Sequence, residues 1–282
     1  MTASMPNPSD RGTELARDWR VSVDKSFETP SSVISYGRRD DRPVVLKVVK
    51  QRGDEWRSGE VLDAFAGRGV VRVYEHVDGA MLLERLEPGT SLAELACTGD
   101  DDQATNILAD VIASMSPGNP PAVCPTVADW GRALTRYLAT GDTQIPEALV
   151  RRAARVYDDL CESQGPTRLL HGDLQHYNIL RDRERGWVAI DPKGVVGELE
   201  YEVGALLRNP VELPDIVTNP AIIERRIGTV SARLGRDADR VLCWAFAQAV
   251  LSATWLVEDG QMVDAGTPSL RLARALEAML GF

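Results

Sequence analysis

The pattern of hydrophobic and polar positions changes about a third of the way along the chain. Before that point the apolar residues form short, β-branched runs separated by turn residues, which is typical of strands. The expected strands cover residues 33–36, 44–49, 70–77 and 81–86. Residues 54–65 interrupt them with apolar side chains near helical spacing and predict one helix. Pro88-Gly89 then breaks the chain.

Beyond this break the apolar residues recur every three or four positions, as in amphipathic helices. The expected helices cover residues 102–115, 127–139, 146–163 and most of the chain from 201 onward. We therefore predict an α+β, bilobal fold: a small β-rich N-terminal lobe over 11–88, a hinge near 84–90, and a larger, mainly helical C-terminal lobe over 89–282. The Pro/Ser-rich residues 1–10 are expected to be disordered.

Composition narrows the possible partners. The chain has 282 residues, 44% apolar residues and a formal net charge of −10. That balance argues against nucleic-acid binding, which requires Lys and Arg to neutralise phosphates, and it suits a cationic ligand. It is also common in proteins that are acidic for solubility alone. Four scattered cysteines without a Cys-x-x-Cys pair indicate neither a zinc site nor disulfides, so a reducing, cytoplasmic location is expected.

No membrane segment is expected. Residues 1–10 lack the apolar stretch of a signal peptide. Residues 241–257 carry no charge, but Gln248, Ser252 and Thr254 interrupt the stretch, which favours a buried helix in the centre of the helical lobe. We expect a monomer or a weak dimer.

The segment His-Gly-Asp-Leu-Gln-His-Tyr-Asn-Ile-Leu at 171–180 carries the candidate chemistry. Asp173 is followed five residues later by Asn178, and Asp191 comes after a short hairpin, an order and spacing that match the catalytic loop and metal-binding aspartate of kinases. Asp173 is placed to accept the proton of an attacking hydroxyl. Asn178 and Asp191 offer the oxygen ligands that Mg²⁺ prefers, so the pattern predicts a site for Mg²⁺ and ATP.

Each of these residues has an ordinary structural interpretation when it stands alone. An Asp or Asn in a loop is usually a turn or cap residue. His171, next to the candidate base, is more often a buried hydrogen-bonding residue, and we expect a scaffold role for it. The complete set in the right order indicates a kinase.

The kinase hypothesis also requires groups in the N-terminal lobe. Lys47, within Val-Val-Leu-Lys-Val-Val, is the candidate for the nucleotide phosphates, although a lysine on an edge strand is common. Glu60 is the expected partner of Lys47, with Glu55 as the alternative. No Gly-x-Gly-x-x-Gly loop is present, and Ser31-Ser32 occupies the first hairpin instead.

Adenine is expected at the hinge. The backbone of Glu84 to Leu86 offers hydrogen-bonding groups there, and Leu83 and Ile190 offer an apolar wall. The alternative interpretation of residues 81–86 is a core strand.

Several stretches resemble the aminoglycoside and hydroxyurea phosphotransferase family, and within it the streptomycin 6-phosphotransferases. The most specific are residues 171–180 and Ala-Ile-Asp-Pro-Lys-Gly-Val-Val-Gly-Glu at 189–198. Residues 67–73, 81–86 and Leu-Leu-Arg-Asn-Pro at 206–210 are also similar. Asp-Pro replaces the Asp-Phe-Gly of protein kinases, and no Ala-Pro-Glu follows, so regulation by an activation segment is not expected.

The resemblance implies ATP- and Mg²⁺-dependent phosphorylation of a cationic antibiotic, at the 6-hydroxyl of streptomycin, or of hydroxyurea in some members. Asp173 is then the base, Asn178 and Asp191 the metal ligands, and Lys47 the phosphate lysine. The guanidinium groups of streptomycin suit carboxylates and aromatic rings. The candidate substrate residues are Glu198, Glu202, Trp255 and Glu258, with Glu200, Asp259 and Trp244 as further possibilities; a core position is the better interpretation of both tryptophans, and a surface position is an alternative for the acids.

Three other functions are compatible with parts of the pattern. A kinase of choline, homoserine or a sugar would share the fold, since pockets vary faster than catalytic loops. A nucleotide-binding pseudokinase is disfavoured because the four candidate groups Lys47, Asp173, Asn178 and Asp191 are all present. A protein kinase is disfavoured by the missing substrate-side motifs.

Overall fold

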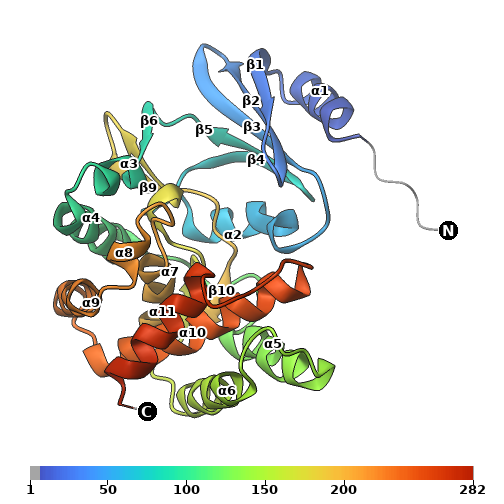
Figure 1. Ribbon diagram of the computed structural model, residues 1–282. Helices are drawn as coiled ribbons and strands as arrows, with labels where there is room; N and C mark the ends of the chain where they lie inside the picture. Colours follow the sequence, from blue (N-terminus) through green and yellow to red (C-terminus); the bar gives the residue numbers. More distant parts are fainter. Residues whose placement is uncertain (1–6, 282) are drawn as a thin grey trace.

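The N-terminal lobe is a five-stranded antiparallel sheet in the order β1-β2-β3-β5-β4 (Figure 1). The computed structural model describes residues 7–281. The strands are β1 (Ser22–Glu28), β2 (Ser32–Arg39), β3 (Arg42–Val49), β4 (Val73–Val77) and β5 (Ala80–Glu84). The four predicted strands are confirmed, with β4 beginning three residues later than expected. β1 was not predicted, and all seven of its residues are exposed, which leaves no periodic apolar pattern to find.

Helix α1 (Pro8–Asp18) corrects the expectation of a disordered N-terminus for residues 8–10. The Asn7 side chain accepts a hydrogen bond from the Ser9 N–H at 2.9 Å, and Pro8 occupies the first helical position, so both start signals are present. Ala16 of this helix is buried against the outer face of the sheet. Residues 1–6 of the expected disordered segment lie outside the described residues.

Strand β3 lies in the middle of the sheet, and its alternation decides which side chains face the other lobe. Val44, Leu46 and Val48 pack on the face covered by α1. Because successive side chains point to opposite faces, Lys47 points the other way, toward the C-terminal lobe. It is only 5% exposed.

The predicted helix over residues 54–65 is two elements. A 3₁₀ turn, η1 (Asp54–Arg57), precedes α2 (Ser58–Phe65). The change of pitch means that positions in the turn and the helix do not share one helical face. Glu55 lies on the turn and Glu60 on the helix, which matters for the partner of Lys47.

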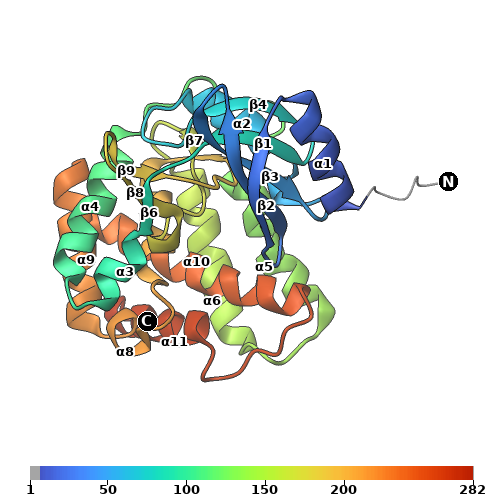
Figure 2. The same ribbon diagram turned by 90° about the horizontal axis from the view of Figure 1, so that it is seen from above.

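The C-terminal lobe is built from helices that surround one long buried helix (Figures 1 and 2). They are α3 (Leu92–Cys97), α4 (Asp101–Ser114), α5 (Val127–Thr140), α6 (Glu147–Glu162), α7 (Gly204–Leu207), α8 (Pro214–Val217), α9 (Pro220–Leu234), α10 (Ala238–Glu258) and α11 (Pro268–Met279). This division into a β-rich and a helical lobe confirms the predicted fold class.

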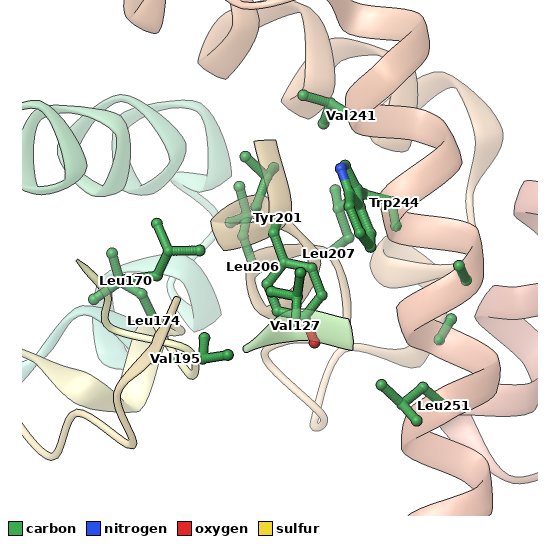
Figure 3. Close-up of a cluster of buried hydrophobic side chains, with 14 of the residues drawn as sticks. Val127, Leu170, Leu174, Val195, Tyr201, Leu206, Leu207, Val241, Trp244 and Leu251 are labelled. Carbon is green, nitrogen blue, oxygen red and sulfur yellow. The ribbon is translucent and has the colours of Figure 1, made fainter. Parts of the chain in front are cut away.

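Helix α10 is the one described helix long and apolar enough to cross a membrane by length and composition. Its middle is packed inside the lobe, where Trp244 meets Tyr157 edge-to-face at a centroid distance of 5.1 Å. Trp244 also meets Tyr201 edge-to-face at 5.0 Å (Figure 3). The prediction of a buried central helix is confirmed, and so is the core position of Trp244.

Two small sheets hold the segment that carries the candidate chemistry. β7 (Arg168–Leu170) pairs with β10 (Val195–Gly197), and β8 (Ile179–Asp182) lies between β6 (Pro88–Ser91) and β9 (Gly186–Ala189). Residues 171–178 therefore connect a strand of one small sheet, β7, with a strand of the other, β8. The short 3₁₀ turn η2 (His176–Asn178) ends this connection.

Candidate active site

A cavity of about 1030 Å³ lies between the two lobes and the hinge. Ser31, Lys47, Leu83 and Leu86 line it from the N-terminal lobe and hinge. Asn178, Ile190 and Asp191 line it from the C-terminal lobe. Residues that are far apart in the sequence thus meet in one cleft, and its size suits a nucleotide.

Lys47 forms a contact between the lobes. Its Nζ atom is 2.8 Å from Asp191 Oδ1 and 2.9 Å from Glu55 Oε2. Burial favours the neutral amine, but the charges of Asp191 and Glu55 and their hydrogen bonds outweigh it and raise the pKa of Lys47. The ammonium group is therefore charged at neutral pH and held between two carboxylates.

The expected pairing of Glu60 with Lys47 is wrong. Glu60 Oε1 is instead 2.6 Å from Arg57 Nη2, on the neighbouring turn of the same segment. Glu55, the alternative, is the partner. The reason is the 3₁₀ turn, because it places Glu55 beside the sheet while the helix turns Glu60 away from Lys47.

The loop at residues 171–178 is held by its own histidine. His171 is fully buried, and its Nε2–H donates to the carbonyl oxygen of Ile190 at 2.8 Å. Its Nδ1 accepts the Asp173 N–H at 3.3 Å. Burial lowers the pKa of His171, so the ring is neutral and can accept at Nδ1 while it donates at Nε2. These contacts fit the expected scaffold role and fix the backbone of Asp173.

Asn178 faces the same loop from η2. Its Nδ2–H donates to the Asp173 carbonyl oxygen at 2.9 Å, which fixes which way the amide points and leaves Oδ1 as a possible ligand atom. Asp191 follows β9 and has a left-handed backbone (φ 56°), which is uncommon for non-glycine residues, although Asp adopts it more often than most.

The donor chemistry fits a magnesium ion held together with nucleotide phosphates. No group of three or more His, Cys, Asp or Glu side chains gathers into a metal cage within residues 7–281. Asn178 and Asp191 line the cleft as one amide and one carboxylate, and Mg²⁺ in nucleotide sites is usually bound by one or two such ligands plus phosphate oxygens. Their role as metal ligands stays a prediction.

Glu202 lies below the loop and not in a substrate pocket, which corrects its predicted role. Its Oε2 accepts the His171 N–H at 2.7 Å and its Oε1 accepts the Gly172 N–H at 3.0 Å. It is 2% exposed. Burial raises the pKa of Glu202 to about 7, although the loop N–H groups oppose that change. Glu202 therefore anchors the loop to the short 3₁₀ turn η3 (Leu199–Val203).

Glu198 is also wrong as a substrate residue. It is 2% exposed, accepts the Gly165 N–H at 2.9 Å and is 2.6 Å from Arg240 Nε. Trp244 Nε1 donates to the same carboxylate. Glu198 therefore joins helix α10 to the loop before β7, and none of its oxygens is free for a ligand from solvent. Glu200 is buried as well.

Trp255 and Glu258 do lie in a second hollow, of about 340 Å³, beside helix α5. The Trp255 ring meets Trp130 edge-to-face with centroids 5.6 Å apart. Lys193, two residues beyond Asp191 in the sequence, also lines this hollow. The remaining lining residues are Asp129, Arg136 and Asp259.

At the hinge, the prediction for Glu84 concerned its backbone groups, but its side chain also forms contacts. Its Oε1 accepts the Arg72 N–H at 2.8 Å and also the Nη1–H of Arg185, a residue of the other lobe. Leu86 is buried and lines the cleft as expected. Sequence reasoning missed Arg185, Arg136 and Lys193, and the charged run Arg-Asp-Arg-Glu-Arg at 181–185 was the one visible signal among them.

The fold is that of kinase-like phosphotransferases. A thermostable variant of an aminoglycoside phosphotransferase, solved as a ternary complex with ADP and hygromycin B, superposes with a TM-score of 0.67. The match covers 96% of this chain and 99% of that chain at 18% sequence identity. At this level of identity the likeness concerns the fold.

The sequence matches the aminoglycoside/hydroxyurea antibiotic resistance kinases over residues 18–260, and the chain belongs to this family. It is similar to the streptomycin 3''-kinase of Klebsiella pneumoniae, with 35% identity over 86% of this chain and 91% of that protein. It is also similar to the streptomycin 6-kinase of Streptomyces glaucescens, with 28% identity over 88% of this chain and 82% of that protein.

The corrected partner of Lys47 gives a direct test. Replacing Glu55 by Gln should raise the KM for ATP about tenfold, because a charge-assisted contact to Lys47 is lost. Glu60→Gln is the matched control and should leave this KM within twofold, since Glu60 contacts Arg57. Steady-state kinetics at saturating acceptor measure both values, and the opposite ranking would restore Glu60.

The Glu202 carboxyl gives a pH test. Because its pKa rises from 4.5 to about 7 on folding, the native state binds more protons than the unfolded chain between these pH values. Its contribution to the free energy of unfolding is therefore present below about pH 4.5 and is lost as the pH rises toward 7, at about 1.4 kcal/mol for each unit of pKa difference.

Glu202→Gln removes this titration. The stability of the wild type relative to the variant should fall by up to about 3 kcal/mol between pH 5 and pH 8, measured by urea unfolding. A difference that stays constant over this range would show that the carboxyl keeps its ordinary pKa.

Proposed function

We propose that the protein uses ATP and Mg²⁺ to phosphorylate a hydroxyl group of an aminoglycoside of the streptomycin type. The observation that carries the proposal is the meeting of Lys47, Asn178 and Asp191 in one cleft, directly beside the loop of Asp173. A pseudokinase needs no such complete set. Family membership supports an aminoglycoside acceptor over choline, homoserine or a sugar.

The nucleotide is held by groups from both lobes. The adenine lies against Leu83, Leu86 and Ile190, which form the apolar walls near the hinge. Lys47 contacts the α- and β-phosphates, and Glu55 keeps its ammonium in place. Asn178 and Asp191 hold Mg²⁺, which when bound neutralises charge on the phosphates.

Asp173 acts on the acceptor. Its carboxylate accepts a hydrogen bond from the acceptor hydroxyl and takes the proton as the oxygen attacks the γ-phosphorus. The new P–O bond forms as the bond to the β-phosphate oxygen breaks, so that ADP leaves with the electron pair. His171 and Glu202 keep the loop backbone fixed, and such fixed positioning supplies most of the catalysis in phosphoryl transfer.

The acceptor site in this proposal is the hollow of Trp255 and Glu258. Glu258 and Asp259 end helix α10, which has no basic residue in its last turn, so the helix dipole adds to their negative charge. The guanidinium of Arg136 meets Glu258 with two contacts of 2.9 and 3.2 Å. A guanidinium group of streptomycin would take the place of Arg136 on Glu258, or pair with the neighbouring Asp259, beside the two tryptophan rings.

The phosphorylated hydroxyl has two candidates. The resemblance of residues 171–198 favours the 6-hydroxyl. The 35% identity to a streptomycin 3''-kinase favours the 3''-hydroxyl.

The acceptor is tested directly by mass spectrometry. Streptomycin incubated with protein, ATP and Mg²⁺ should gain one phosphate, and phosphorus-coupled NMR of the product should assign it to position 3'' or 6. Glu258→Gln should raise the KM for streptomycin about 3–10-fold, as expected for a half-exposed charge pair. Glu147→Gln, which removes another glutamate paired with arginine, is the control. Turnover of choline in preference to streptomycin would overturn the acceptor assignment.

The base is tested by Asp173→Ala. The substitution should lower kcat about 10²–10⁴-fold, the usual contribution of a positioned proton acceptor. Nucleotide affinity measured by calorimetry should stay near that of the wild type, because Asp173 faces the acceptor. Turnover equal to that of the wild type would remove Asp173 from this role.

A further inference from the structure

The turn between β8 and β9 contacts the hinge through its first and its last residues. Where β8 ends, the Glu87 N–H donates to Asp182 Oδ2 at 3.2 Å, and the Arg183 N–H donates to the Glu87 carbonyl oxygen at 2.8 Å. Just before β9, Arg185 Nη1 contacts the Glu84 carboxylate. We call Asp182, Arg183 and Arg185 the hinge bracket. Figure 2 shows β8 between β6 and β9, so the strand that leads into this turn pairs with the strand that follows the hinge.

Arg185 reaches further than the hinge. Its Nη2–H groups donate to the carbonyl oxygens of Gly67 and Val70 at 2.6 and 3.0 Å. Both carbonyls belong to the N-terminal lobe, in the segment before β4. The Arg185 side chain is 17% exposed and that of Glu84 is 11% exposed. One guanidinium from the C-terminal lobe therefore holds three acceptors of the other lobe in a largely buried place.

Asp182 keeps the turn itself in shape. Its Oδ1 accepts the N–H groups of Glu184 and Arg185 at 3.0 and 2.9 Å. Burial opposes the charged form, but these N–H groups, that of Glu87 and the charge of Arg185 outweigh it and lower the pKa of Asp182. Asp182 is thus an anion that fixes the backbone from which the Arg185 side chain leaves.

The residues of the hinge bracket do not line the nucleotide cleft, but the hinge segment that they contact does. Glu84, Arg85, Leu86 and Pro88 all line the 1030 Å³ cavity. Hinge residues absorb the backbone changes that let two lobes open. If only a fraction of molecules holds the hinge in the binding geometry, the observed Kd rises by the inverse of that fraction.

We propose that the hinge bracket sets the affinity for the nucleotide, with Arg185 as its positioning residue. The inference rests on the proposed nucleotide cleft. Arg185 touches no nucleotide in it and acts through Glu84 and the loop carbonyls, which it keeps in the binding geometry before the ligand arrives. A charge-assisted contact in a largely buried place is strong enough to shift such an equilibrium.

The test is the affinity of the full chain for AMP-PNP with Mg²⁺, measured by calorimetry. Arg185→Met keeps the aliphatic stem and should raise the Kd about 5–30-fold, as expected for the loss of a hydrogen-bonded charge. Arg185→Lys keeps the charge without the planar guanidinium group, and its Kd should lie between those of the wild type and Arg185→Met. Arg183→Met is the matched control and should leave the Kd unchanged, because Arg183 contacts Glu87 through its backbone N–H, which methionine retains.

A double-mutant cycle separates positioning from general loss of stability. Glu84→Gln combined with Arg185→Met should raise the Kd by less than the product of the two single effects, because both substitutions break the same contact. The KM for the acceptor at saturating ATP should stay within twofold of the wild type in every variant.

An unchanged Kd in Arg185→Met overturns the inference, and so do multiplicative effects in the cycle. A parallel loss of acceptor affinity would indicate a merely structural role and would overturn it as well. Failure of the wild type to bind AMP-PNP would instead disprove the proposed nucleotide cleft, so the two failures are distinguishable.

Discussion

The contact of Lys47 with Asp191 and Glu55 is the interaction on which the rest of the structure depends. It places a buried cation of the small lobe between two carboxylates, one of them from the large lobe. An unpaired charge at this depth would be too costly to keep, so the three groups fix one another. The relative position of sheet and C-terminal lobe follows from this contact and from the hinge on the other side of the cleft.

The polar loop beside this contact is supported by the core beneath it. Leu174 of the loop belongs to the same buried cluster as Leu170, Val195 and Leu206 (Figure 3). Glu202 holds the backbone amides of the loop from below. The loop can therefore keep the half-buried Asp173 beside Asn178, a residue of the cleft lining, while its backbone is fixed. A site that transfers phosphate depends on such fixed groups more than on unusual reactivity.

The charged groups differ between the cleft and the hollow of Trp255 and Glu258. The cleft holds Lys47 among carboxylates, whereas the hollow proposed for the acceptor combines two tryptophans with the acidic end of α10. Arg136 already occupies Glu258 with a guanidinium. The net charge of the whole chain alone indicates only solubility. Two of its acidic groups, Glu258 and Asp259, lie together at the end of α10 beside the hollow.

The sequence by itself determined the two-lobed fold and singled out Lys47, Asn178 and Asp191, which line one cleft, because strand alternation, helical spacing and a short motif are local patterns. Only the tertiary structure decided between Glu55 and Glu60, since a 3₁₀ turn changes which side chain faces the sheet. It also showed that Glu198 and Glu202 are buried and support the fold, although they were predicted to contact the substrate. Burial depends on which other segments of the chain pack against a residue, and the sequence alone does not show this. The hinge bracket likewise joins residues about a hundred positions apart, and no local pattern encodes such a contact.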